Sequence, residues 1–299
     1  MTPTYDVAFL GHYTKDTIVS AAGTRIVDGG AFNYGAHVAA RMGLGVAAIT
    51  RLAREDLGVV EELTRLGVDA FVKTTPESTC LRLEYPSENV DERVIHVTST
   101  AGAFAPQEVA GLQARMFAVG ASMRGEVSLQ VIEALAANEA RIAVDMQGFV
   151  RVARDGILVY EPWPEKEAVL AHVDILKTDA VEAELLTGQA DIGRAAQMIA
   201  GLGPGEVVLT HRDGLLVLAG GQFHQARFYP VDLVGRSGRG DTCLAAYACR
   251  RLVAPPAEAT IWAAAVTSLK MEAEGPFKRD IGAVEALIQQ RYGPGGTPD

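Results

Sequence analysis

The chain has 299 residues, of which 48% are hydrophobic and 21% charged, and its formal net charge is −10. This composition excludes a disordered or fibrous chain, and the acidic balance argues against a protein that binds nucleic acid through its phosphates. The three cysteines form no CxxC pair, so neither a zinc site nor a redox dithiol is indicated. The sequence shows no signal peptide and no apolar run long enough to cross a bilayer, so we expect a cytoplasmic protein without a membrane partner.

The N-terminal half begins as an alternation of strands and helices. The predicted elements lie at 7–10, 31–42, 46–49 and 61–66. Two stretches depart from this alternation: residues 12–28 are partly extended, and residues 79–99 alternate apolar and polar side chains around a turn at 86–89. We predict that these two stretches form a small β lid that projects from the main domain.

From about residue 115 the alternation resumes and becomes regular. Strands are predicted at 116–120, 142–145, 173–177, 207–210 and 215–218, and helices at 129–137, 180–186, 195–202, 242–252 and 260–273. Strands that alternate with helices pair in parallel, so we predict an α/β fold: a doubly wound, mostly parallel sheet with helices on both faces, in one domain over 1–299. Because ligands bind outside the carboxyl ends of such strands, the segments after them should converge on one edge.

The most informative segment is the glycine-rich run from Gly235 to Asp241, which precedes an apolar helix. Glycines permit positive φ and a close ligand approach, and a helix N-terminus presents unpaired N–H groups to an anion. Asp241 stands at the helix start, where it could accept the proton of a hydroxyl during phosphoryl transfer. An aspartate there is by itself more typical of an N-cap, but the glycine spacing favours the catalytic interpretation. The run matches neither a P-loop nor, by its position, a dinucleotide-binding fingerprint.

The segment Gly238-Arg239-Gly240-Asp241-Thr242, followed by an alanine-rich helix, resembles the GAGD signature of the ribokinase-like (PfkB) carbohydrate kinases. Residues 28–33 are similar to that family's sugar-binding Gly-Gly motif, 174–188 to its NxxE region, and 268–277 to the nucleotide-side end of its fold. The resemblance implies a phosphotransferase that uses ATP and Mg²⁺ to phosphorylate a hydroxyl of a small molecule by direct in-line transfer.

The resemblance also implies roles for individual residues. Asp241 would be the catalytic base, and the backbone of Gly238, Arg239 and Gly240 would form an anion hole. The acceptor would be bound by Asp16, Gly30 and Asn33, and His12 follows the first strand beside the same expected site. The residues expected on the ATP side are Asp179, Thr210, Arg212 and Gly214, with Glu182 organising Mg²⁺ through water.

Among the departures from the family pattern, Asp179 replaces an asparagine, Arg212 a glycine and Gly235 an aspartate. These departures leave a catalytically weak sugar- or nucleotide-binding regulatory protein as an alternative. A nicotinamide-dependent oxidoreductase is disfavoured, since no GxGxxG follows the first strand.

The predicted acceptor is an unphosphorylated sugar or polyol, because residues 12–37 offer few cations for a substrate phosphate. A nucleoside that stacks on Phe32 or Tyr34 is the alternative. The edge of a small lid sheet can be covered by a second lid, so a homodimer through the lid is a further expectation.

Overall fold

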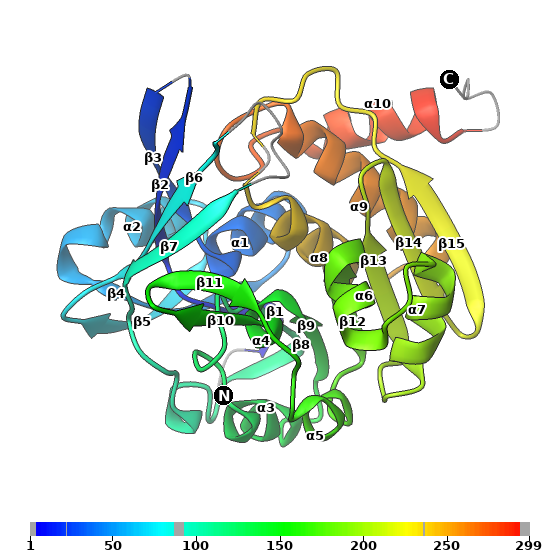
Figure 1. Ribbon diagram of the computed structural model, residues 1–299. Helices are drawn as coiled ribbons and strands as arrows, with labels where there is room; N and C mark the ends of the chain where they lie inside the picture. The colour runs from blue at the N-terminus through cyan, green and yellow to red at the C-terminus, as the bar shows by residue number, and fades with distance from the viewer. Residues whose placement is uncertain (1–3, 22, 87–92, 236, 294–299) are drawn as a thin grey trace.

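The computed structural model describes residues 4–21, 23–86, 93–235 and 237–293. Within these residues the chain forms a large sheet of nine strands and a small sheet of six (Figure 1). The large sheet contains, from edge to edge, β15 (Gln222–Arg227), β14 (Gly214–Ala219), β13 (Glu206–Thr210), β12 (Ile175–Asp179), β9 (Arg141–Asp145), β8 (Gln113–Val119), β1 (Thr4–Leu10), β4 (Val46–Ala53) and β5 (Asp69–Thr75).

The large sheet is parallel from β13 to β5, and β14 and β15 extend it as an antiparallel edge. Apolar residues run without interruption from Val7 to Leu10 in β1, because both faces of this part of the strand are covered. Val7 and Phe9 belong to one buried cluster, whereas Ala8 and Leu10 belong to a second cluster on the opposite face. The predicted doubly wound α/β fold is therefore confirmed.

Helices cover both faces of the large sheet. One face carries α1 (Ala31–Arg41), α2 (Gly58–Arg65), α8 (Arg239–Arg250), α9 (Pro256–Met271) and α10 (Ile281–Arg291). The other carries α3 (Leu129–Ala136), α5 (Lys166–Leu170), α6 (Ala180–Thr187) and α7 (Ile192–Ala200). A single helical turn, α4 (Gln147–Val150), and two 3₁₀ turns, η1 (Arg54–Asp56) and η2 (Pro106–Glu108), complete the helical elements of the described residues. In this part of the chain no helix combines the length and the apolar character needed to span a membrane.

The small sheet contains β10 (Arg151–Arg154), β11 (Ile157–Tyr160), β7 (Val94–Ser99), β6 (Thr79–Glu84), β2 (Thr14–Ser20) and β3 (Gly23–Gly29), in that order. The two stretches predicted to be extended, 12–28 and 79–99, supply its four strands β2, β3, β6 and β7. The predicted turn between β6 and β7 lies, beyond Pro86, outside the described residues. The hairpin of β10 and β11 was not predicted, although Asp155 and Gly156, both at positive φ, are a typical hairpin turn.

Several elements of the large sheet and its cover were also not predicted, among them the short helix α5. Strand β5 lies at a sheet edge and is half exposed, and β15 forms the opposite edge, so neither carries the apolar run of a central strand. Helix α10 buries only Val284 completely, so it shows a weak apolar stripe. Helix α8 begins at Arg239, inside the glycine-rich run rather than after it. This early start places Gly240 and Asp241 in the first helical turn.

Candidate active site

Two adjoining cavities lie between the carboxyl edge of the large sheet and the small sheet. The larger has a volume of about 490 Å³ and is lined by segments that follow β9, β12 and β13, as the sequence predicts. The smaller has a volume of about 90 Å³ and is lined by β2, β6, β7 and the segment after β8. Both cavities are lined by Arg93, Ile95, Gln147, Arg151, Ser237, Gly238 and Asp241. Asp241 therefore stands where the two cavities meet.

The glycine-rich turn has no room for side chains at two of its positions. Gly238 precedes α8 with φ of 73°, and a Cβ there would lie 2.2 Å from Cε1 of Tyr34. A Cβ on Gly240 would lie 2.6 Å from Nζ of Lys177. Glycine at both positions keeps the first turn of α8, where a helix favours an anion, open to the larger cavity.

Charged neighbours set the proton affinity of Asp241. Its burial, helped by the charge of Asp145, raises the pKa of Asp241 to about 6, although the cations of Lys177, Arg151 and Lys270 oppose the shift. A carboxylate with a pKa just below neutral is ionised at physiological pH yet holds a proton better than an exposed aspartate. These properties suit a general base.

A buried lysine, Lys177, lies under the first turn of α8. It is 3% exposed, and its Nζ lies 3.0 Å and 3.3 Å from the two carboxylate oxygens of Asp145. Burial alone would lower the pKa of Lys177, but the charges of Asp145, Glu182 and Asp179 raise it, so the group is an ammonium ion. Our sequence analysis missed Lys177. The sequence did contain a signal for this residue, because a lysine within a buried strand such as β12 needs a charged partner.

The larger cavity has a cationic lining. Arg151, from β10, is buried, and its guanidinium lies 3.3 Å from the hydroxyl of Tyr160 and 3.8 Å from Oε1 of Glu182. The other basic residues along this cavity are Lys177, His211, Arg212, Arg239 and, at its border with the smaller cavity, Arg93. A lining of this kind suits a ligand with several negative charges, such as a di- or triphosphate.

The residues predicted on the donor side divide into two groups. Asp179, Thr210 and Arg212 line the larger cavity, as does Arg239 of the predicted anion hole. Gly214 is not among its described lining residues. It lies in β14, where a Cβ would be 2.2 Å from the carbonyl oxygen of Ala226, so strand packing alone accounts for this glycine.

Glu182 and Asp179 form a capping box at the start of α6. The backbone N–H of Glu182 donates to Oδ1 of Asp179, and the backbone N–H of Asp179 donates to Oε2 of Glu182, both at 2.9 Å. Glu182 is completely buried, and burial raises the pKa of its carboxyl group to about 7.

The described residues contain no group of three or more His, Cys, Asp or Glu side chains that could hold a metal ion. Oε1 of Glu182 is nevertheless buried without a hydrogen-bond partner, and Asp179 beside it reaches the larger cavity. Mg²⁺ commonly takes one or two carboxylates and completes its shell with phosphate oxygens and water. The two residues fit such an ion, arriving with a phosphorylated donor.

Asp16 and Gly30, which were predicted to bind the acceptor, line the smaller cavity. Oδ1 of Asp16 is buried and has no hydrogen-bond partner, so it can accept a bond from a hydroxyl in the cavity. Burial raises the pKa of Asp16 to about 7, and the nearby charge of Asp241 adds to the shift. Gly30 has φ of 98°, and a Cβ there would lie 2.1 Å from the carbonyl oxygen of His12.

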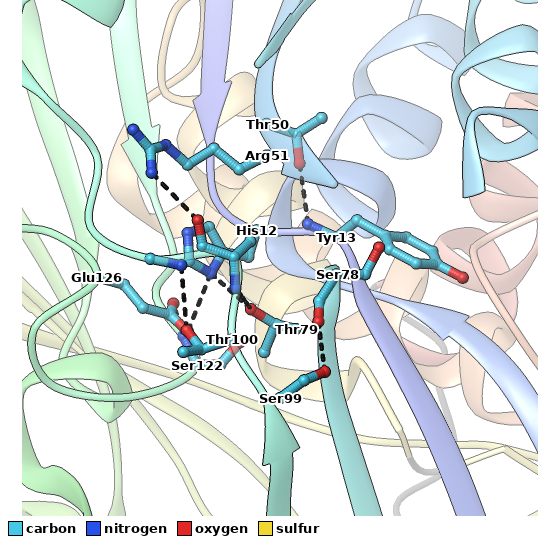
Figure 2. Close-up of polar contacts among 12 residues, drawn as sticks. His12, Tyr13, Thr50, Arg51, Ser78, Thr79, Ser99, Thr100, Ser122 and Glu126 are labelled. Atoms are coloured by element: carbon cyan, nitrogen blue, oxygen red, sulfur yellow. Dashed lines mark hydrogen bonds and ion pairs between the residues drawn. The ribbon is translucent and has the colours of Figure 1, made fainter. Parts of the chain in front are cut away.

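Asn33 and His12 are buried but are not among the described residues that line the smaller cavity. Asn33 donates from Nδ2 to the carbonyl oxygen of Asp28 at 3.3 Å. Figure 2 shows His12 directed at Thr79 and Glu126, with its Nδ1 at 2.9 Å and 3.2 Å from their oxygens.

Glu126 connects His12 to the cavity wall. Its Oε2 accepts a 2.7 Å hydrogen bond from the backbone N–H of Ser122, a residue that does line the smaller cavity. Figure 2 shows the same connection. His12 thus supports the wall of the smaller cavity through Glu126 and Thr79, and its predicted role in binding the acceptor stays a prediction.

The sequence model of the pfkB family carbohydrate kinases matches residues 8–277, so this chain belongs to that family. No curated protein sequence matches the chain. The chain is accordingly a ribokinase-family phosphotransferase that acts on a hydroxyl group of a sugar or polyol.

Two similar solved structures are of pyrophosphate-dependent kinases. One is a pyrophosphate-dependent kinase in the ribokinase family complexed with a pyrophosphate analogue and myo-inositol; it is 32% identical, covers 94% of this chain and 99% of its own, and has a TM-score of 0.86. The other is a pyrophosphate-dependent myo-inositol-1 kinase converted into a myo-inositol-3 kinase by two substitutions to leucine. It is also 32% identical, covers 94% of this chain and 98% of its own, and has a TM-score of 0.86. Arabidopsis thaliana ribokinase complexed with ribose and ATP is 20% identical, covers 97% of this chain and 99% of its own, and has a TM-score of 0.77, which shows the fold.

Proposed function

We propose that this protein transfers a phosphoryl group from a donor in the larger cavity to a hydroxyl of a ring polyol in the smaller cavity, with Asp241 as the base. The observation that carries the proposal is the position of Asp241, which lines both cavities at the N-terminus of α8. A base at this point reaches the acceptor hydroxyl on one side and faces the phosphoryl group on the other.

The reaction is a direct displacement at phosphorus. The acceptor oxygen attacks the terminal phosphorus, its proton passes to the carboxylate of Asp241, and the bond between that phosphorus and the bridging oxygen breaks. The developing charge is stabilised by the N–H groups of the first turn of α8 and by the ammonium of Lys177 beside Gly240. Mg²⁺ near Asp179 and Glu182, when bound, would neutralise charge on the donor phosphates.

Two donors compete in this proposal: ATP, which the sequence predicts, and pyrophosphate. The segment that resembles the nucleotide side of the fold, 268–277, contributes none of the described residues along the larger cavity. It is joined instead to the segment before α8, since Lys270 donates to the carbonyl oxygen of Gly235 at 2.7 Å and Ser268 accepts from the N–H of Tyr229 at 2.9 Å. The cation-lined cavity and the similarity to pyrophosphate-dependent kinases favour pyrophosphate as the donor.

The acceptor is proposed to be an inositol or a sugar of similar size. The smaller cavity is suited to a single ring, and Asp16 offers an unpaired oxygen to a hydroxyl. A relative of 32% identity was solved with myo-inositol, which makes that polyol the first acceptor to test. A nucleoside would need additional space for its base, so it is the weaker candidate.

The test measures phosphoryl transfer from pyrophosphate and from ATP, each with Mg²⁺, to inositols, pentoses, hexoses and nucleosides. We expect turnover of an inositol with pyrophosphate and a loss of about 100-fold to 10,000-fold in kcat for Asp241→Asn, because the variant removes the base but keeps the shape of the site. Asp232→Asn is the matched control, since Asp232 is exposed and lies outside the described lining of both cavities.

Three outcomes would change this interpretation. Near-normal kcat in Asp241→Asn would contradict the role of the base. Turnover with ATP alone would restore the donor predicted from the sequence. Binding of an acceptor without turnover by either donor would favour a regulatory binding protein.

A further inference from the structure

Lys270 is a buried cation beside the candidate active site that the proposed reaction does not use. It lies in the last turn of α9 and is 2% exposed. Burial lowers the pKa of Lys270 to about 8, against the opposing charges of Glu274 and Asp241, so at neutral pH the group is still largely an ammonium ion. A buried charge costs free energy unless it binds a partner, so the contacts of its Nζ indicate what it does.

The first contact of this Nζ is with the start of the glycine-rich run. Lys270 donates to the carbonyl oxygen of Gly235 at 2.7 Å, and the backbone N–H of Gly235 donates to the carbonyl oxygen of Met271 at 3.0 Å. A Cβ on Gly235 would collide with the carbonyl oxygen of Ala273. The end of α9 therefore holds both backbone groups of Gly235, at a distance that only glycine permits.

The second contact is with the ring of Tyr34. Nζ of Lys270 lies 5.4 Å from the centroid of that ring, within the range of a cation–π interaction. The same ring packs against Gly238 at the start of α8, where it leaves no room for a Cβ. Lys270 thus contacts the glycine-rich run directly at Gly235 and, through Tyr34, at Gly238.

The charge of Lys270 also acts on the proposed base. Burial raises the pKa of Asp241, and Lys270 is one of three cations that oppose the rise, so its removal should raise that pKa further. The side chains whose charges bear on Asp241 come from several elements: Asp16 of β2, Asp145 of β9, Arg151 of β10, Lys177 of β12 and Lys270 of α9. The neutral phenol of Tyr34 faces Asp241 from α1.

We propose that Lys270 is a positioning residue for phosphoryl transfer: it holds the glycine-rich run, and with it Asp241 and the first turn of α8, in the arrangement that receives the phosphoryl group. This inference rests on the proposed kinase function. Lys270 is not among the described residues that line either cavity, so its effect reaches the reaction through the run. A displacement of about 1 Å in the reacting groups can cost about 100-fold in rate, so such an anchor matters for turnover.

The first experiment compares Lys270→Met with the wild type in steady-state kinetics with pyrophosphate and myo-inositol. Methionine fills similar space beside Tyr34 but removes the bond to Gly235 and the charge. We expect kcat to fall about 10-fold to 100-fold and KM for myo-inositol to change by less than about threefold. The acid limb of kcat should move to higher pH. Lys270→Arg keeps a charge and a donor, so it should leave that limb in place and recover part of kcat.

Ser268→Ala is the matched control. Ser268 is completely buried in the same helix, and its hydroxyl accepts a bond from the N–H of Tyr229 at 2.9 Å, outside the glycine-rich run. We expect Ser268→Ala to lower the unfolding temperature at least as much as Lys270→Met, because methionine also removes the cost of burying an ammonium ion. The control should nevertheless keep the wild-type kcat and acid limb.

A second measurement does not depend on turnover. Isothermal titration with pyrophosphate and Mg²⁺, in the absence of an acceptor, compares the wild type, Lys270→Met and Ser268→Ala. We expect Lys270→Met to bind pyrophosphate about tenfold more weakly than the other two proteins, because the run loses an anchor that organises it before the donor binds.

Wild-type kcat with a wild-type acid limb in a folded Lys270→Met variant would overturn the inference and leave the proposed function intact. An equal loss of kcat in Ser268→Ala would also overturn it, because the effect would then come from the stability of α9. Weaker pyrophosphate binding by Lys270→Met alone, in a protein without turnover, would support the role of Lys270 and contradict the proposed function. Equal pyrophosphate affinity of the three proteins, or binding by none, would count against Lys270 as an anchor of the run.

Discussion

Asp241 is the residue whose ionisation should govern the pH dependence of turnover. Burial raises its pKa to about 6, so it is protonated, and unable to accept a proton, below that pH. We expect kcat to be constant above about pH 7 and to fall about tenfold for each pH unit below about 6. Steady-state rates between pH 5 and 8 at saturating donor and acceptor measure this profile, and a flat profile down to pH 5 would contradict the assignment.

Two variants test whether Lys177 acts as a catalytic cation or only as the structural partner of Asp145. Replacing it by methionine leaves the buried carboxylate of Asp145 without its partner, which we expect to cost about 3–5 kcal/mol of folding stability. The double variant Lys177→Met, Asp145→Asn removes both charges and should recover much of that stability. Because the phosphoryl group still lacks its ammonium neighbour, kcat should remain at least about 100-fold below the wild-type value.

Thermal unfolding and kcat of the two variants separate these effects. Recovery of kcat together with stability in the double variant would show that Lys177 acts only by pairing with Asp145.

The start of α8 is the element on which the site depends. Gly238→Ala should impair both folding and turnover, because an L side chain at φ of 73° costs about 1–2 kcal/mol and its Cβ would also collide with the ring of Tyr34. Gly43→Ala is the matched control, since Gly43 has φ of 74° but open space around its Cβ position. Denaturant unfolding and kcat of both variants measure the difference, and equal losses would show that the collision is unimportant.

The elements that could be predicted from the sequence are those whose local pattern matches their environment. The apolar runs in β1 and β13 are buried on both faces, so they could be recognised as central strands. The glycine spacing of the turn before α8 is more typical of a ligand-binding turn than of a purely structural one. The edge strands β5 and β15 are only partly buried, so their pattern resembled that of loops. Local sequence therefore indicated the central sheet better than its edges.

At the candidate site, residues that come together only through tertiary contacts could not be predicted from the sequence. Asp16 and Asp241 could be assigned to one site through the resemblance to the ribokinase-like family, and both line the smaller cavity. Lys177 and the apolar residues of the smaller cavity could not be placed, because Lys177 reaches the site from inside a strand, and Leu81, Leu83 and Ile95 meet only when β6 and β7 pair. The placement of His12 behind Ser122 likewise depends on contacts with Thr79 and Glu126, which lie far away in the sequence.

At the scale of the whole molecule, the small sheet lies over the carboxyl edge of the large sheet (Figure 1), and the acceptor cavity has walls from both sheets. Polar contacts join the sheets near η1, where Asp56 accepts hydrogen bonds from Lys15 at 2.8 Å and from Ser78 at 2.5 Å. The lid function of the small sheet and the homodimer through it stay predictions.

An acceptor that contacts both sheets should stabilise their packing. We expect saturating myo-inositol to slow amide hydrogen exchange in β6 and β7, because a ligand that binds only the closed arrangement stabilises it by about 2.7 kcal/mol at one hundred times its Kd. Strand β15, at the far edge of the large sheet, should be unaffected and serves as the internal control. Exchange measured by mass spectrometry with and without myo-inositol tests this, and equal protection of β6, β7 and β15 would indicate general stabilisation of the fold instead of closure of the small sheet over the acceptor.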